Sequence, residues 1–167
     1  MLPGVVRSFL ASGLLYVVAA SAVHAADGTP PTIAAAPGKE VCAAAAGTNA
    51  MAAELCVTGG NFSHDRYALK LGGRTVLNGI DDQTTAGIAS KVNNQNVVLQ
   101  CVPQNVFPKA TAAENLAEVR RVLPNASEAR VKEIADLLVP PLGMELGRLC
   151  TATGDGQAFL AVQVVFN

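Results

Sequence analysis

The stretch RYALKLGGRTVLNG, residues 66–79, carries the clearest structural signal in the chain. Two strand-like runs flank Gly72 and Gly73, a pair that readily adopts the positive φ angles of a two-residue hairpin turn. We therefore predict a β-hairpin centred on these glycines.

Two further pairs of strand-like runs follow along the chain. Residues 84–102 are divided by the polar stretch NNQN at 93–96, and residues 144–166 are divided by GDG at 154–156. Asn, Asp and Gly are the residues that turns of this kind require. The sequence thus predicts three antiparallel hairpins.

Between the second and third hairpins the apolar period lengthens from two to about 3.6 residues, which indicates α-helix. The run TAAENLAEVRRVL begins at Thr111, which forms a capping box with Glu114. The run NASEARVKEIADLLVPP begins at Asn125, which we expect to cap the second helix with Glu128 before a proline pair ends it. Each helix has one apolar stripe, formed by Leu116, Val119, Val122 and Leu123 in the first and by Val131, Ile134, Leu137 and Leu138 in the second.

Strand pairs with a separate helical pair predict an α+β fold, with a mainly antiparallel sheet of five to seven strands and an inserted αα-hairpin. The apolar stripes of the helices must be buried, and we expect them to pack across one face of the sheet. The Ala-rich stretch between Cys42 and Cys56 predicts a short helical segment ahead of the sheet. Residues 41–167 are expected to form a single domain.

The N-terminus has the layout of a secretory signal peptide over residues 1–25. Arg7 precedes an apolar run from Phe9 to Val23, and small residues follow. An uncleaved anchor is the alternative, but a membrane-spanning helix needs about 20 apolar residues. Residues 26–40 are rich in Ala, Pro and Gly and indicate a flexible tail. We expect an exported protein that is not inserted in the membrane after cleavage.

Four cysteines in an exported chain predict two structural disulfides. Cys42 and Cys56 bracket the Ala-rich stretch, whereas Cys101 and Cys150 end two strand-like runs that would lie side by side. Of the three possible connectivities, we favour Cys42 with Cys56 and Cys101 with Cys150. A four-thiolate zinc site is the alternative, and the chain lacks the closely spaced cysteine pairs typical of such sites.

Ser63, His64 and Asp65 are the three residue types of a hydrolytic triad in consecutive positions. A triad needs side chains that converge from separate parts of a fold, whereas consecutive side chains diverge. We interpret this stretch as a polar turn before a strand. Asp81 and Asp82 are a weak signal for a divalent ion, because their spacing does not match an EF-hand loop, and we interpret them as a solvated turn. No metal and no cofactor are predicted.

Charge and composition narrow the class of partner. The chain has a formal net charge of −1 at pH 7, and loss of the signal peptide with Arg7 leaves 11 basic and 13 acidic residues. This balance offers no electrostatic footprint for nucleic acid. The Ala-rich, aromatic-poor composition is typical of a bacterial protein, which favours the periplasm, with secretion as the alternative.

With no catalytic constellation, the sequence favours a non-catalytic binding protein, in particular a protein-interaction module such as an inhibitor or an immunity-type protein. The alternative is an envelope enzyme with a dispersed active site near His64. Two arginines on the outward face of the helical pair offer bidentate contacts to a partner. Together with residues of two polar loops, the candidates for partner binding are Arg120, Arg121, His64, Asp65, Asp81 and Asp82.

Overall fold

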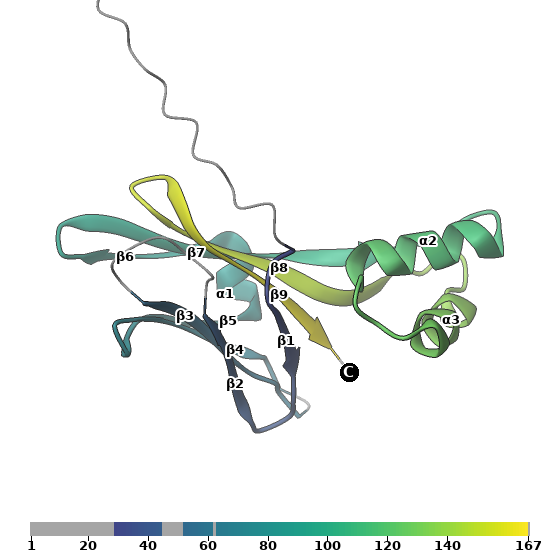
Figure 1. Ribbon diagram of the computed structural model, residues 1–167, viewed down its shortest axis with the longest axis horizontal. Coiled ribbons are helices and arrows are strands. Elements are labelled where there is room, and N and C mark those ends of the chain that lie inside the picture. Colours follow the sequence, from purple (N-terminus) through teal and green to yellow (C-terminus); the bar gives the residue numbers. More distant parts are fainter. Residues whose placement is uncertain (1–28, 45–51, 62, 167) are drawn as a thin grey trace, which may run out of the picture.

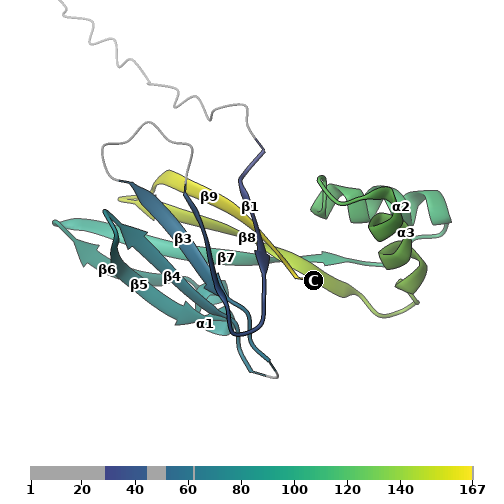
Figure 2. The same ribbon diagram turned by 60° about the horizontal axis from the view of Figure 1, so that its bottom comes forward.

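The computed structural model describes residues 29–44, 52–61 and 63–166, in which nine strands form two sheets that face each other (Figures 1 and 2). The five-stranded sheet has the order β1-β9-β8-β7-β6, and the four-stranded sheet has the order β2-β3-β4-β5. The elements are β1 (Thr32–Ala35), β2 (Glu40–Ala44), β3 (Ala53–Thr58), β4 (Arg66–Leu71), β5 (Arg74–Ile80), α1 (Asp81–Ala86), β6 (Ile88–Val92), β7 (Gln95–Val106), α2 (Ala112–Val122), α3 (Glu128–Leu137), β8 (Met144–Gly154) and β9 (Gln157–Phe166).

The α+β class and the mainly antiparallel pairing are confirmed, but the strands divide between two sheets instead of forming one. Each sheet has an apolar face, and the two faces bury each other, as in sheet sandwiches. The four-stranded sheet contributes Leu55 and Leu69 to this shared core, and the five-stranded sheet contributes Leu99 and Val162. All four side chains are fully buried.

All three predicted hairpins are present, and each has a two-residue turn. The turn residues Gly72 and Gly73 join β4 to β5 with φ angles of 56° and 77°. The equivalent positions are Asn93 and Asn94 between β6 and β7, and Asp155 and Gly156 between β8 and β9, again with positive φ. Positive φ at both central residues matches the right-handed twist of the flanking strands.

The chain ahead of the first hairpin differs from expectation. Residues 32–35, predicted to belong to a flexible tail, form β1, which pairs in parallel with β9 and buries Ile33. The stretch around Cys42 and Cys56 forms β2 and β3 instead of a helical segment. Ala53, Leu55 and Val57 are buried at every second position of β3, the period of a strand, and Cys56 between them is buried by its disulfide.

Both predicted disulfides are present, and both join residues that lie directly opposite each other on paired strands. Cys42 bonds to Cys56 across β2 and β3, and Cys101 bonds to Cys150 across β7 and β8. The predicted signal peptide, residues 1–25, lies outside the described residues.

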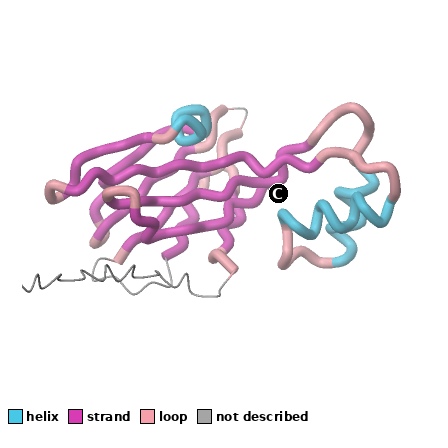
Figure 3. The backbone as a smooth tube through the Cα atoms, turned by 90° about the horizontal axis from the view of Figure 1, so that it is seen from above, coloured by secondary structure: helices cyan, strands magenta, loops and turns pink. Residues whose placement is uncertain are grey.

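The helical pair packs at the end of the sandwich and not across a sheet face, so that expectation was wrong. β7 and β8 continue beyond the other strands as a two-stranded ribbon, and α2 and α3 sit at its far end (Figures 2 and 3). The four-stranded sheet already covers the inner face of the five-stranded sheet, so the helices do not pack there. The helices bury their stripes in a second core that includes Val106, Leu146, Val119 and Ile134.

The caps of the two helices were only partly predicted. Thr111 caps α2 in a capping box with Glu114, as expected. The N-cap of α3 lies two residues later than predicted, because the Ser127 hydroxyl, and not Asn125, accepts the N–H of Arg130.

Candidate functional site

His64 and Asp81 form a direct side-chain contact at one end of the sandwich. His64 lies just before β4, and Asp81 is the first residue of α1, which replaces the solvated turn expected there. Nδ1 of His64 lies 2.7 Å from Oδ1 of Asp81 and 4.0 Å from Oδ2 of Asp82. The β4–β5 hairpin, in which Arg66 pairs with Ile80, brings these two segments together.

Asp65 has a different role from the one that a consecutive triad would give it. Its carboxylate accepts the N–H of Gly60 at 2.8 Å, and its backbone carbonyl accepts the N–H of Asp81 at 3.2 Å. The acidic partner of His64 is therefore Asp81, from a separate segment. This supports the interpretation of residues 63–65 as a turn before a strand, with Asp65 joining the turn to α1.

A buried arginine holds α1 from inside the sandwich. Arg148 of β8 forms an ion pair with Glu145 at 2.7 Å and donates to the backbone carbonyl of Asp81 at 3.0 Å and to the Thr85 hydroxyl at 2.9 Å. A buried charge is tolerated when it is paired and fully hydrogen-bonded. These bonds position Asp81 independently of its contact with His64.

Tyr67 lies on β4, three residues after His64, and its side chain belongs to the core between the two sheets. Its side chain is fully buried, and its hydroxyl has no hydrogen-bond partner among the described residues. Burial raises the pKa of this phenol well above its ordinary value, and the neighbouring charges of Arg148, Asp65 and Asp81 also act on it. The hydroxyl is therefore held neutral beside two carboxylates and one guanidinium.

The cluster formed by His64, Asp81 and Asp82 supports two kinds of chemistry. A carboxylate on Nδ1 can orient an imidazole as a general base. An imidazole with two carboxylates can also hold a divalent cation. In the described part of the chain, no serine or cysteine side chain bonds to His64, so a nucleophile next to the imidazole is not assembled.

The two arginines predicted to bind a partner are exposed but already paired. Arg120 bonds to Glu128 and so connects α2 to α3. Arg121 bonds to Glu118 within α2 at 2.8 Å, and this hydrogen bond lowers the pKa of Glu118. Any partner would have to compete with these carboxylates for the guanidinium groups.

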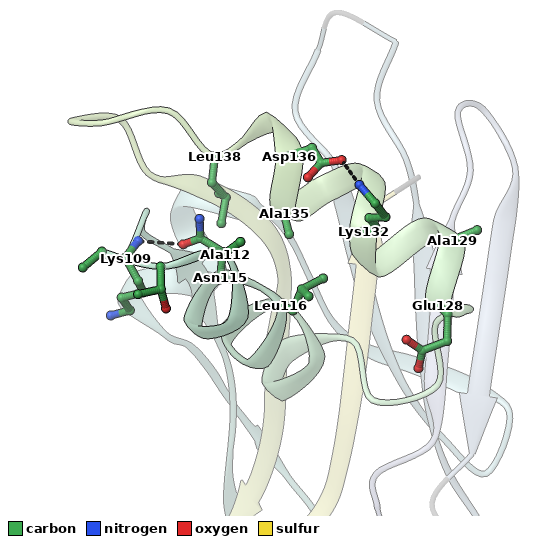
Figure 4. A pocket seen from close by; sticks show the side chains of 12 residues that line it. Lys109, Ala112, Asn115, Leu116, Glu128, Ala129, Lys132, Ala135, Asp136 and Leu138 are labelled. Carbon is green, nitrogen blue, oxygen red and sulfur yellow. Dashed lines mark hydrogen bonds and ion pairs between the residues drawn. The ribbon is translucent and has the colours of Figure 1, made fainter.

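A groove of about 590 Å³ lies between α2, α3 and the loop that precedes them (Figure 4). Its lining includes the apolar side chains of Leu116 and Leu138, together with Lys109. On one wall Lys132 pairs with Asp136 at 2.6 Å. The groove thus combines an apolar lining with charges around it.

Four large apolar side chains are exposed at the end of α3 and on the loops that join the helical pair to β7 and β8. Phe107 packs against Gly143, since an added Cβ at that glycine would lie 2.4 Å from the ring, and the residue is nevertheless 53% exposed. The other three lie between the end of α3 and β8, and we name the four residues the apolar tip: Phe107, Leu137, Val139 and Leu142.

No family model, curated protein or solved structure matches the chain. Among the described helices, none has the length and apolar character needed to cross a bilayer. The two disulfides are compatible with an oxidising, extracellular environment.

Sequence reasoning missed both the apolar tip and Arg148. Leu137 had been assigned to the buried stripe of α3, although it is 57% exposed. The run LLVPPLG contained a usable signal, because apolar residues next to two prolines cannot continue a helix and so need another place to pack. Arg148 gave no signal, since one cation in a strand-like run is typical of a solvent-facing position.

Proposed function

We propose that this protein is an exported, disulfide-stabilised protein-binding module that captures its partner with the apolar tip and the adjoining groove of the helical pair. The supporting observation is that four exposed apolar side chains lie on the segments that enter and leave the helical pair, and that Phe107 on the first segment contacts Gly143 on the second. Among the described residues, five large apolar side chains are exposed, and only Val102 lies outside the tip. Exposed apolar side chains gathered in one place mark interaction sites, whereas single ones do not.

The position of the tip favours binding by the helical end of the molecule. The helical pair has its own core and extends from the sandwich on the β7–β8 ribbon, so a partner can approach it from several sides (Figure 2). Most charged side chains of α2 and α3 are already neutralised within the pair, as in Arg130 with Glu133 and Lys132 with Asp136. A partner of the helical pair would therefore interact mainly with its apolar side chains.

The chemistry of the groove indicates the kind of segment that would bind. Its apolar lining suits one or two aliphatic or aromatic side chains of a protein partner. Lys109 lines the groove and has no ion-pair partner within the described ranges. We expect a protein segment whose apolar anchor is accompanied by an acidic residue that faces Lys109.

The test compares capture of envelope proteins by three forms of the protein. In the first variant Val139→Ser and Leu142→Ser are combined. The control, Val102→Ser, removes an apolar side chain that lies outside the tip, on β7, and is 53% exposed. A partner that binds the wild type and the control, but binds the double variant at least tenfold more weakly, supports the proposal. Equal binding to all three forms would exclude the tip as the docking surface.

A second candidate function, hydrolysis of envelope material with His64 as general base, is favoured by the 2.7 Å contact with Asp81. It predicts turnover of peptidoglycan or another envelope polymer by the purified protein. His64→Ala would abolish that turnover without affecting capture of a partner at the tip. Absence of turnover in the wild type excludes this candidate.

A further inference from the structure

Three side chains that can bind a metal ion, from two separate segments of the chain, lie close together. Nδ1 of His64 and one carboxylate oxygen each from Asp81 and Asp82 all lie within 4.8 Å of one another. A second grouping, Glu40 with Cys42 and Cys56, is unsuitable, because both sulfurs are engaged in a disulfide.

The spacing of the three atoms suits a small cation with short bonds. Ligands about 2.0 Å from a tetrahedral ion are about 3.3 Å apart. The His64–Asp81 separation of 2.7 Å and the His64–Asp82 separation of 4.0 Å lie on either side of that value. Small side-chain rotations suffice to equalise them, and the Asp82 side chain, which is 79% exposed, is free to rotate.

The charges around the cluster also favour a cation. Asp65, Asp81 and Asp82 lie together, and no lysine or arginine side chain within the described ranges forms an ion pair with any of them. The guanidinium of Arg148 forms its ion pair with Glu145 and donates to the backbone carbonyl of Asp81, not to its carboxylate. Among the described residues, His64 is therefore the basic side chain in direct contact with the carboxylates of Asp81 and Asp82.

A separate observation comes from the interior side of the cluster. The Tyr67 hydroxyl is fully buried without a hydrogen-bond partner among the described residues, and buried polar groups of this kind are uncommon. Tyr67 follows Asp65 by two residues on β4 and pairs with Gly79 of β5, two residues before Asp81, so it lies next to both segments that form the cluster. A water bound to a cation at the cluster would supply a partner for such a group.

We propose that His64, Asp81 and Asp82 bind one divalent transition-metal ion of the zinc class. Imidazole nitrogen selects zinc over magnesium or calcium, which prefer all-oxygen sites. The ion binds the Nδ1 lone pair of the neutral imidazole, whose one ring proton is then carried by Nε2. Arg148 and the backbone of Asp65 hold Asp81 in place before the ion arrives. Three protein ligands leave a coordination position open to water.

The test is calorimetric titration of the tag-free protein with zinc chloride, with magnesium chloride as a second titrant. We expect one zinc per chain and no heat from magnesium. His64→Ala and Asp82→Asn should each weaken zinc binding at least tenfold. Asp136→Asn is the matched control, since it removes an exposed carboxylate from α3, far from the cluster in sequence, and should leave zinc binding unchanged.

Each other outcome overturns the proposal. Absence of zinc binding by the wild type excludes the site directly. If His64→Ala retains full affinity while Asp82→Asn does not, the cation site uses oxygen ligands alone and is not of the zinc class. Equal affinity in all variants places the zinc elsewhere. Circular dichroism of each metal-free variant verifies that its fold is retained, which is expected because both substituted side chains are exposed.

Discussion

Tyr67 is a buried phenol whose hydroxyl finds no hydrogen-bond partner in the described part of the chain. Leaving a polar group buried and unpaired costs about 1–3 kcal/mol. Replacement by phenylalanine removes the hydroxyl and retains the ring that packs in the core. We predict that Tyr67→Phe is neutral or raises the free energy of unfolding by up to about 1 kcal/mol, measured by urea denaturation. A loss of more than about 1 kcal/mol would show that the hydroxyl makes a stabilising bond.

The same residue predicts how stability depends on pH in the alkaline range. Burial raises the pKa of Tyr67 in the folded state above its value of about 10 in the unfolded chain. The unfolded chain therefore loses the phenol proton at a lower pH than the folded protein does. The effect of this pKa difference on stability is constant below about pH 10, and the free energy of unfolding declines as the pH rises further. The slope should be about 1.4 kcal/mol per pH unit. The difference in unfolding free energy between wild type and Tyr67→Phe, measured as a function of pH, isolates the part due to the phenol. A difference that does not change with pH above pH 10 would contradict the prediction.

The start of α3 shows how an element depends on one side chain. The Ser127 hydroxyl accepts the N–H of Arg130, whereas Asn125 lies two residues before this N-cap. We predict that Ser127→Ala lowers the free energy of unfolding by about 1 kcal/mol, the usual cost of losing an N-cap. Asn125→Ala should cost less than about 0.5 kcal/mol, as expected for an exposed loop residue. The reverse order in chemical denaturation would mean that the helix begins at the cap predicted from sequence.

Two separate cores organise the whole molecule. No residue between 107 and 143 belongs to the core shared by the two sheets. Val106 pairs with Met144, so β7 and β8 can be joined there by a two-residue Asn-Gly turn in place of the helical pair. We predict that this deletion, made together with Val106→Thr and Leu146→Thr to avoid exposed apolar side chains, leaves a folded sandwich. Far-ultraviolet circular dichroism and cooperative thermal unfolding measure the result.

The outcome of the deletion bears on function as well as on folding. A folded sandwich that no longer captures the partner agrees with docking at the helical end. Loss of cooperative unfolding would show that the two cores depend on each other.

The sequence by itself determined the local elements of this protein. Each two-residue turn needs residues that tolerate positive φ, and Gly72 with Gly73 or Asn93 with Asn94 meet that need without help from the rest of the fold. The capping box at Thr111 and the apolar periods of α2 and α3 are likewise properties of neighbouring residues. For this reason the α+β class, the three hairpins and the helical pair were all predictable.

Only the tertiary structure decided how these elements combine. The division into two sheets depends on which apolar faces pack together. Because the sheets cover each other, the helical pair packs at the end of the β7–β8 ribbon. The contact between His64 and Asp81 requires the register of the β4–β5 hairpin and the anchor from Arg148 on a strand 67 positions away. Interactions over such separations depend on packing between distant segments, which leaves no periodic pattern in the sequence.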